Sequence, residues 1–247
     1  MDNTKYISLS RQMGLWKQMD IVSNNMANMN TSGFKSQDAL FRTYVAQTVD
    51  AKGFGRQPVH FTQDFAAYKD FSEGQMVETG NPLDMAIKGN AFFAVETADG
   101  EKYTRKGQFH LDSDRKIVTG DGLPVLSEGN APIFIAPTEL EIYISETGEV
   151  STENGIIGRL KLVNFSDDQK LLKIADTLFE NTFGNVMTLG ANESTIHQGL
   201  IEKSNVNSIT EMTKLINLQR SYEYVQQMID NEHTRLSKAI DVFSQIA

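Results

Sequence analysis

A stretch of forty residues near the C-terminus constrains the fold most, because residues 207–246 contain neither glycine nor proline. Apolar side chains recur there in alternating steps of three and four, which is the spacing of positions a and d in a heptad repeat. Nine of these ten positions are apolar and Glu232 is the exception: Leu215, Leu218, Tyr222, Val225, Ile229, Glu232, Leu236, Ala239, Phe243 and Ile246. The pattern predicts one helix, about 60 Å long, with an apolar seam of the coiled-coil type.

A second helix is predicted at the N-terminus, where residues 4–31 contain no proline and a single glycine, Gly14. Its apolar residues form two stripes at helical spacing. The first stripe is Tyr6, Leu9, Met13 and Trp16, and the second is Leu15, Met19, Val22, Met26 and Met29. A helix with apolar residues on more than one side needs more than one neighbour. We expect the C-terminal helix to be one neighbour and other chains to supply the rest.

The N-terminal helix ends in the amide-rich stretch SNNMANMNTSGFK, residues 23–35. Gly33 suits the left-handed position that terminates many helices. Two interpretations of the asparagines stay open. They could fix the register of helices at a buried seam, where an unpaired amide costs roughly 1–3 kcal/mol, or they could only cap and fray a helix end. The candidate packing residues of this stretch are Asn24, Asn25, Ala27, Asn28, Thr31, Gly33 and Phe34.

The middle of the chain reads differently from both ends. Residues 36–80 predict an extended, irregular connection, in which 41–49 could continue in helix. Short alternating runs between turn residues then predict antiparallel hairpins. The fold class is therefore mixed α and β, with the terminal helices paired and a mainly antiparallel β domain between them. The expected parts are an N-terminal helix at 1–35, the connection at 36–80, the β domain at 81–195 and a C-terminal helix at 196–247.

Enzymatic chemistry has no positive signal in this sequence. The chain has no cysteine, and its four histidines lack the spacing of a metal site. Asp112 and Asp114 begin like a calcium loop, but Lys116 stands where an oxygen ligand is needed, so a charged turn is expected. We expect no enzyme activity, no cofactor and no metal, and the net charge of −9 argues against nucleic-acid binding. No apolar run is long enough for a membrane span or a signal peptide, which by itself indicates a cytoplasmic protein.

Four stretches resemble the axial proteins of the bacterial flagellum, which form its rod and hook. They are SNNMANMNTSGFK from Ser23, TGNPLDMAIKGNAFFAVE from Thr79, YTRKGQFHLDSDRKIVTGDGLPVL from Tyr103 and GLIEKSNVNSITEM from Gly199. The short connection and the opening MDNTKYISLSRQM resemble the proximal-rod subunit most, with the distal rod subunit second. The resemblance covers the chain almost from end to end.

The resemblance implies a structural subunit of the basal-body rod, which self-assembles through its terminal helices and is required for motility. Its implied partners are other rod subunits and the flagellar type III export machinery. It also implies a place in the periplasmic part of the basal body, reached without a cleavable signal peptide, in place of the cytoplasm. The packing residues would then include Leu215, Leu218, Tyr222, Val225, Ile229 and Leu236.

An export signal and two other functions remain open. Phe41 and Val45 fit the loose Phe-x-x-x-apolar pattern of such signals, and Phe61 and Phe65 fit it as well. A non-flagellar secreted coiled-coil protein is one alternative, which would show repeats or a signal peptide. An enzyme built on the β domain is the other, and it would require a pocket with converging polar groups.

Overall fold

The structure is a computed structural model that describes residues 2–49, 56–139, 141–175, 177–182, 186–188 and 194–246. The chain forms two compact units. Unit 1 contains Met1–Ala27, Gln37–Tyr68 and Asn207–Ala247, and unit 2 contains Asn28–Ser36 and Lys69–Val206. Each unit is therefore assembled from segments that lie far apart in the sequence.

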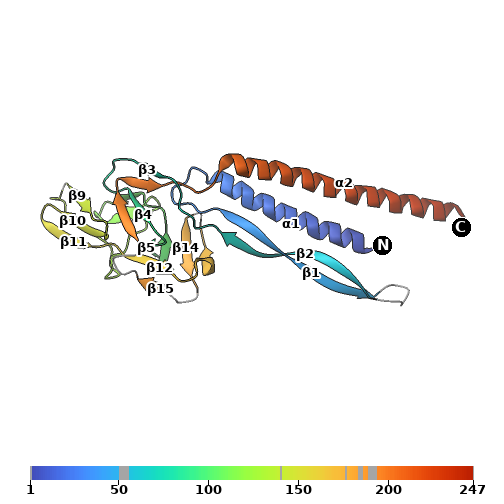
Figure 1. Ribbon diagram of the computed structural model, residues 1–247, viewed down its shortest axis with the longest axis horizontal. Helices are drawn as coiled ribbons and strands as arrows, with labels where there is room; N and C mark the ends of the chain where they lie inside the picture. Colours follow the sequence, from blue (N-terminus) through green and yellow to red (C-terminus); the bar gives the residue numbers. More distant parts are fainter. Residues whose placement is uncertain are drawn as a thin grey trace. The chain divides into compact units, whose positions relative to one another are not determined.

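Unit 1 is built on the two predicted helices. Helix α1 spans Asp2–Ala27 and helix α2 spans Ser208–Ile246, and they pack against each other (Figure 1). Seven heptad positions of α2 have described side chains, and all are buried or half-buried: Leu215, Leu218, Tyr222, Val225, Ile229, Glu232 and Leu236. The 3.5-residue period therefore marks the covered side of α2.

The two stripes of α1 have different surroundings. In the second stripe Val22 is buried, and Leu15, Met19 and Met26 are half-buried, whereas Met29 lies beyond the end of α1 and is 38% exposed. The four residues of the first stripe are exposed to 50–66%: Tyr6, Leu9, Met13 and Trp16. Helix α1 thus places one stripe in the interior of unit 1 and leaves the other at its surface.

The segment expected as an irregular connection is a hairpin in the structure. Strand β1 spans Gln37–Val49 and pairs with β2, Arg56–Lys69, as Figure 1 shows. The expectation of helix over 41–49 is wrong. This run contains two threonines, one tyrosine and two valines, which favour strands, and pairing with β2 supplies partners for the backbone groups that face it.

Unit 2 is the β domain, and all of its described strand pairings are antiparallel, as predicted. Its strands are β3 Met76–Glu78, β4 Met85–Lys88, β5 Phe92–Thr97, β6 Gly100–Thr104, β7 Phe109–Leu111, β8 Ile117–Thr119, β9 Ile142–Ile144, β10 Glu149–Thr152, β11 Gly155–Arg159, β12 Leu162–Phe165, β13 Leu171–Lys173, β14 Leu178–Asn181, β15 Val186–Thr188, β16 Thr195–Gln198 and β17 Leu200–Glu202. A short 3-10 helix, Asp168–Lys170, precedes β13.

The largest sheet of unit 2 has the strand order β13-β14-β6-β5-β12-β15. A three-stranded sheet has the order β11-β10-β9, and the remaining strands pair as β16-β4, β17-β3 and β7-β8. Successive residues of a strand point to opposite faces. Phe92 and Phe93 of β5 accordingly belong to two separate apolar clusters, and both are 0% exposed. The central position of β5 therefore divides the core of unit 2 in two.

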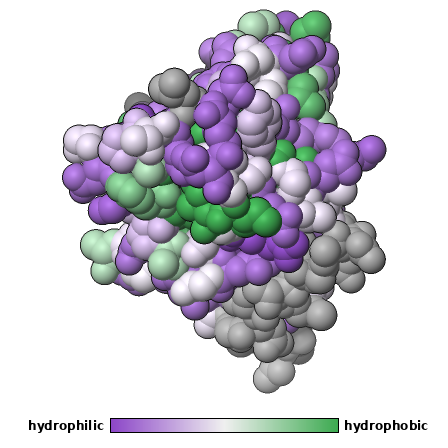
Figure 2. Space-filling model, turned by 90° about the vertical axis from the view of Figure 1, so that its left-hand side faces the viewer, coloured by the Kyte–Doolittle hydropathy of each residue, from purple (hydrophilic) through white to green (hydrophobic). Residues whose placement is uncertain are grey.

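The three-stranded sheet has two large exposed side chains, Tyr143 and Ile156. Figure 2 looks onto the side where Figure 1 labels β9, β10 and β11, and it shows hydrophobic residues among hydrophilic ones. Tyr143 and Ile156 are exposed, and both lie opposite Ser151 in the strand register. In the described part of the chain, neither helix is apolar over a length that would cross a membrane.

Candidate functional site

Three charged side chains from three of the sequence motifs meet inside unit 2. The Nζ of Lys35 lies 2.7 Å from Oε1 of Glu202, and Nη1 of Arg105 lies 3.6 Å from Oε2 of the same carboxylate. All three side chains are 1% exposed. We call Lys35, Arg105 and Glu202 the buried ion cluster.

The buried ion cluster connects distant segments through their backbones. Lys35 Nζ donates to the carbonyl oxygen of Ser72 at 2.6 Å, and the N–H of Gly74 donates to Oε1 of Glu202 at 2.8 Å. Arg105 Nη2 donates to the carbonyl oxygen of Gly89 at 2.6 Å. A single carboxylate thus fixes the position of several loops of unit 2.

The electrostatics of this cluster are unbalanced, because two buried cations face one carboxylate. Burial lowers the pKa of Lys35; Glu202 opposes this shift and Arg105 adds to it. Burial also lowers the pKa of Arg105, against the attraction of nearby carboxylates such as Glu202. When one partner of a buried ion pair is removed, the charge that stays behind is buried without a counter-ion and strongly destabilises the fold. The cluster therefore depends on Glu202, the carboxylate that forms ion pairs with both buried cations.

At the Gly-Phe-Lys end of the first motif, each residue has a different structural role. Gly33 has a φ of +67°, and a Cβ there would lie 2.4 Å from the carbonyl carbon of Arg105. Its N–H donates to the carbonyl oxygen of Glu202 at 2.8 Å. Phe34 is fully buried, with Lys173 Nζ 4.1 Å from the centre of its ring. The glycine permits a close approach that any side chain would block.

The side-chain amide of Asn205, in the last motif, forms hydrogen bonds to two segments at the boundaries of unit 2. Asn205 Oδ1 accepts from the N–H of Ser36 at 2.9 Å, and its Nδ2 donates to the carbonyl oxygen of Asp70 at 2.8 Å. The N–H of Asp70 donates in turn to the carbonyl oxygen of Ser36 at 2.9 Å. Ser36, Asp70 and Asn205 each lie within two residues of a boundary of unit 2. The motif residues therefore join the chain segments at which unit 2 begins and ends.

Unit 1 contains a second polar arrangement, centred on Asn25, which is 1% exposed. Its Nδ2 donates to the carbonyl oxygen of Gln37 at 2.8 Å and to Oε2 of Glu211 at 3.0 Å. Its Oδ1 accepts from the N–H of Gln37 at 3.1 Å. One amide thus joins α1 to the start of β1 and to the first turn of α2.

The first turn of α2 is also held by a cap and by ion pairs. The N–H groups of Ile209 and Thr210 both donate to Oδ1 of Asn207 at 3.1 Å, as at a helix N-cap. Lys214 Nζ lies 2.8 Å from Oε1 of Glu211 and 3.1 Å from Oδ1 of Asp38. Burial opposes the charge of Lys214, but hydrogen bonds to Glu211 and Asp38 raise its pKa. This network anchors the beginning of the long helix.

The other predicted packing residues of the amide-rich stretch lie in mixed surroundings. Asn24 and Ala27 are exposed, whereas Asn28 is buried and its Oδ1 accepts from the hydroxyl of Thr31 at 3.0 Å. Gly33 belongs to the buried surroundings of Arg105, described above. Asn25 and Asn28 are therefore buried and hydrogen-bonded within the chain, and the side chains of Asn24 and Ala27 are exposed.

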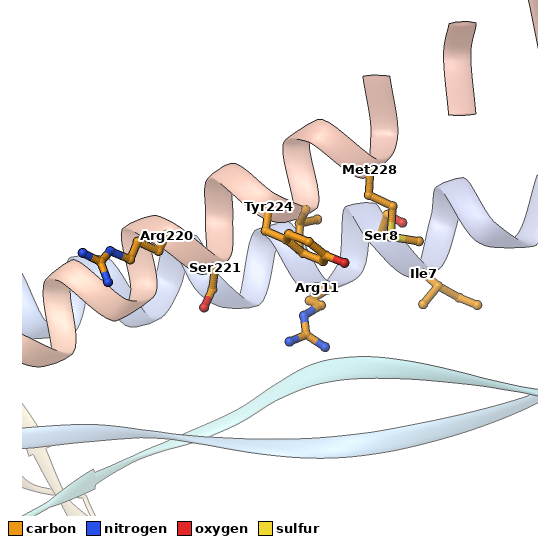
Figure 3. Close-up of a pocket in the computed structure, with 8 residues that line it drawn as sticks. Ile7, Ser8, Arg11, Arg220, Ser221, Tyr224 and Met228 are labelled. Carbon is orange, nitrogen blue, oxygen red and sulfur yellow. The ribbon is translucent and has the colours of Figure 1, made fainter. Parts of the chain in front are cut away.

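The predicted seam residues of α2 lie in unit 1. Val225 is 4% exposed, and it lines a groove between α1 and α2 with a volume of about 440 Å³ (Figure 3). Phe41, from the predicted export pattern, is half-buried in β1. The side chains of its partner Val45 and of the alternatives Phe61 and Phe65 lie outside the described part of the structure.

Sequence reasoning named Gly33 and Phe34 but missed the three charged members of the buried ion cluster. The signal was present, because Lys35, Arg105 and Glu202 belong to three of the motifs and are two cations and one anion. In the described residues, no three histidine or carboxylate side chains are grouped as metal ligands. The geometry is that of a fastening between segments, since each charge meets another charge or a backbone group.

Comparisons with known proteins agree with the positions of these motifs. Residues 6–35 match the family described as "Flagella basal body rod protein". Residues 86–152 match "Flagellar hook protein FlgE/F/G D1 domain", and residues 197–242 match "Flagellar basal body rod FlgEFG protein C-terminal".

Individual relatives extend over the whole chain. The flagellar basal-body rod protein FlgF of Caulobacter vibrioides is 39% identical over 246 residues, which cover 100% of both chains. FlgF of Mesorhizobium japonicum is 30% identical over 97% of both chains. FlgG of Bacillus subtilis is 29% identical over 96% of this chain and 97% of its own. The chain therefore belongs to the family of flagellar basal-body rod proteins.

Proposed function

We propose that this chain is a structural subunit of the flagellar basal-body rod that self-assembles through its terminal helices and is required for motility. The observation that carries the proposal is the first stripe of α1. Tyr6, Leu9, Met13 and Trp16 are exposed to 61%, 50%, 66% and 60%. Aligned apolar side chains of this size mark interaction sites on folded proteins.

Helix α2 adds a second apolar patch at its beginning. Ile209, Met212 and Ile216 are exposed to 76%, 54% and 46%. They recur at steps of three and four, so they share one face of the helix. Burying large apolar side chains stabilises an interface by about 25 cal/mol per Å² of apolar area. Both helices thus have more apolar surface than their mutual packing uses.

The role of the chain is mechanical in this proposal, and no step of catalysis is assigned to it. Other rod subunits are its partners, and the periplasmic part of the basal body is its location. Unit 2, which is fastened by the buried ion cluster, would act as a rigid body carried by the helical assembly. The distal part of the rod is the second candidate position, because FlgG proteins are relatives of similar identity.

The decisive test is to delete the gene and to complement the strain with a tagged copy. The deletion should abolish swimming, and the tagged chain should be recovered in purified basal bodies, where labelling locates it along the rod. Complementation with a variant that lacks residues 208–246 separates export from assembly, because the variant should be found outside the basal body. Swimming of the deletion strain, or absence of the chain from basal bodies, would contradict the proposal.

Export by the flagellar type III machinery is part of the same proposal. Phe41→Ala should reduce secretion of the chain, whereas Leu40→Ala, at the exposed neighbouring position of β1, should not. Both variants need a check of folding, because Phe41 is half-buried. Equal secretion of the two variants would remove Phe41 and Val45 as the signal and leave the rod function in place.

A further inference from the structure

The turn between β10 and β11 contains the single Asn-Gly pair of the sequence, Asn154–Gly155. Asparagine is one of the chemically labile residues, and its reaction depends on what surrounds its side chain and the next main-chain nitrogen. Glu153 and Asn154 form the turn, and all residues from Glu153 to Ile156 are exposed. Water therefore has free access to this end of the hairpin.

The side-chain amide of Asn154 is not held by other groups. Within the described part of the chain, no hydrogen bond engages it. Asn130, in another exposed turn, differs in this respect, because its Oδ1 accepts from Nζ of Lys161 at 2.7 Å. The amide of Asn154 can therefore rotate toward its own main chain without breaking an interaction.

The main-chain nitrogen of Gly155 is the nucleophile within reach of that amide. It closes a five-membered ring when it bonds to Cγ of Asn154, and a following residue with a side chain would crowd the nitrogen. A Cβ built on Gly155 meets no atom within 4 Å, so the space around this position is open. Gly155 and Thr152 form the last pair of the β10–β11 ladder. The ends of such ladders open most easily, so the nitrogen becomes available while unit 2 stays folded.

We propose that Asn154 is a site of spontaneous covalent modification in the folded chain, namely deamidation through a cyclic imide formed with Gly155. The bond between the nitrogen of Gly155 and Cγ of Asn154 forms, and the bond between Cγ and Nδ2 breaks. Nδ2 leaves as ammonia and takes with it the proton of the Gly155 N–H. The inference is independent of the proposed rod function.

Water opens the imide in two ways. Addition at Cγ breaks its new bond to Gly155 and yields aspartate in the ordinary main chain. Addition at the main-chain carbonyl carbon of residue 154 breaks the original peptide bond, so the chain continues through Cγ as isoaspartate. Water is the only co-reactant, and no step returns asparagine. The modified fraction should therefore increase with the time since synthesis.

The two products should affect the hairpin differently. Aspartate adds a negative charge beside Glu153, whereas isoaspartate also adds an extra carbon atom to the main chain of a tight turn. The turn sets the register of a hairpin. The pairings of Thr152 with Gly155 and of Ser151 with Ile156 should therefore weaken when isoaspartate forms.

The test uses the full-length folded chain, incubated at neutral pH and sampled over days. Peptide mass spectrometry measures the conversion of each asparagine. Methyl transfer from labelled S-adenosylmethionine by an isoaspartate-specific methyltransferase measures isoaspartate. We expect both products at Asn154, in amounts that rise with time. Asn130 should stay unchanged, because Ala131 follows it and the N–H of Ala131 donates to Oγ of Ser127 at 3.4 Å.

Two variants complete the experiment. Asn154→Gln keeps an amide but places it one methylene group farther away, so it should lose both signals at this position. Freshly purified Asn154→Asp carries the new charge on an ordinary main chain. Hydrogen exchange over residues 151–157 should be faster in the aged wild type than in fresh Asn154→Asp, which isolates the effect of the lengthened main chain. Circular dichroism should show that all samples remain folded.

Three results would overturn the inference. If Asn154 stays intact in the folded chain while the denatured chain converts under the same conditions, the hairpin holds the nitrogen of Gly155 out of reach. Equal conversion of Asn130 would mean that exposure alone decides. Aspartate without isoaspartate would indicate direct hydrolysis of the amide and no cyclic imide. Each of these results leaves the proposed rod function untouched.

Discussion

Lys35 Nζ donates a 2.7 Å hydrogen bond to Oε1 of Glu202, and these side chains are both 1% exposed although they are 167 residues apart in sequence. The pair joins the end of the first motif to the last one. Arg105, from a third motif, contributes a second cation at 3.6 Å. Three charged residues of the motifs that resemble the family therefore pair with one another inside unit 2, whereas the exposed stripe of α1 belongs to unit 1.

Removal of the central carboxylate should destabilise unit 2 strongly. In Glu202→Gln two buried cations lose their counter-ion, and we expect the free energy of unfolding to fall by about 3–5 kcal/mol. The control is Glu149→Gln, which breaks an ion pair with Arg159 whose side chains are 42% and 33% exposed. The control should cost about 1 kcal/mol or less. Denaturant unfolding of the full chain measures both, and similar losses in the two variants would contradict a special role for the cluster.

The glycine of the Gly-Phe-Lys motif should be irreplaceable for reasons of space. Gly33→Ala and Gly80→Ala start from nearly the same φ, +67° and +71°. The left-handed conformation alone costs a side chain about 1–2 kcal/mol. A Cβ at Gly80 meets nothing within 4 Å, whereas one at Gly33 would lie 2.4 Å from the backbone of Arg105. Thermal unfolding should therefore show a clearly larger loss for Gly33→Ala, and equal losses would mean that conformation alone explains the glycine.

Two adjacent asparagines offer a matched pair at the end of α1. Asn25→Asp replaces the donor to Glu211 by a second carboxylate, at a site where the original bond measures 3.0 Å. We expect a loss of roughly 1–3 kcal/mol, the cost of leaving buried polar groups unpaired. Asn24 is exposed, so Asn24→Asp should change stability by about 0.5 kcal/mol or less. Helix melting followed by circular dichroism compares them, and a larger loss for Asn24→Asp would refute the assignment.

A charge at the covered side of α2 should prevent assembly. Val225 is 4% exposed, and an aspartate there must be desolvated at an effective cost of several kcal/mol. The control is Gln227→Asp, at an exposed position of the same helix. The neighbouring Gln226 is unsuitable, because its Oε1 accepts a 2.6 Å hydrogen bond from Nε2 of Gln12 in α1. At matched levels of secreted chain, Val225→Asp should abolish motility and incorporation into the rod, and Gln227→Asp should be much milder. Normal swimming of the Val225→Asp strain would disprove the role given to the helix pair.

The stability of unit 2 should depend on one tyrosine at high pH. Burial, with Glu101 nearby, raises the pKa of Tyr103 to about 12. The unfolded value is about 10, so the stabilisation is complete below pH 10 and disappears as the pH rises toward about 12, an effect of up to roughly 2–3 kcal/mol. Tyr103→Phe should show a flatter decline of unfolding free energy over this interval. A hydrogen bond to Glu141 raises the pKa of Tyr143 as well, but this side chain is 53% exposed, so Tyr143→Phe should flatten the decline much less than Tyr103→Phe does.

Local patterns were sufficient for the existence of both helices and for the antiparallel character of unit 2. They did not give the helix bounds, because α1 ends at Ala27 and not at 35, and strands β16 and β17 occupy the beginning of the range 196–247 that was expected to be helical. The absence of glycine and proline over 207–246 predicted one uninterrupted helix, and α2 spans Ser208–Ile246. The same reasoning did not predict the hairpin β1–β2. Its run over 41–49 has apolar residues that fit a helix or a strand, and only pairing with β2 decides between them.

The motifs contain the three charged residues of the buried ion cluster, but they do not show that these residues meet. The partnership of Lys35 with Glu202 depends on the path of the chain between them, which brings segments 167 residues apart into contact. No periodic pattern encodes such a contact, because hydrophobic spacing reports the face of a local element and not its distant neighbour.

The sequence by itself determined that α1 has two apolar stripes, but not which of them would be covered. Both stripes recur at helical spacing, and the exposed one contains the larger side chains, Tyr6 and Trp16. The tertiary structure decides which stripe is covered. Helix α1 packs against α2 and β1, and the hydrogen bond between Asn25 and Glu211 helps to fix its rotation about its own axis. Burial depends on what lies beside a helix, so an intrinsic property of the helix such as its periodicity cannot select the buried face.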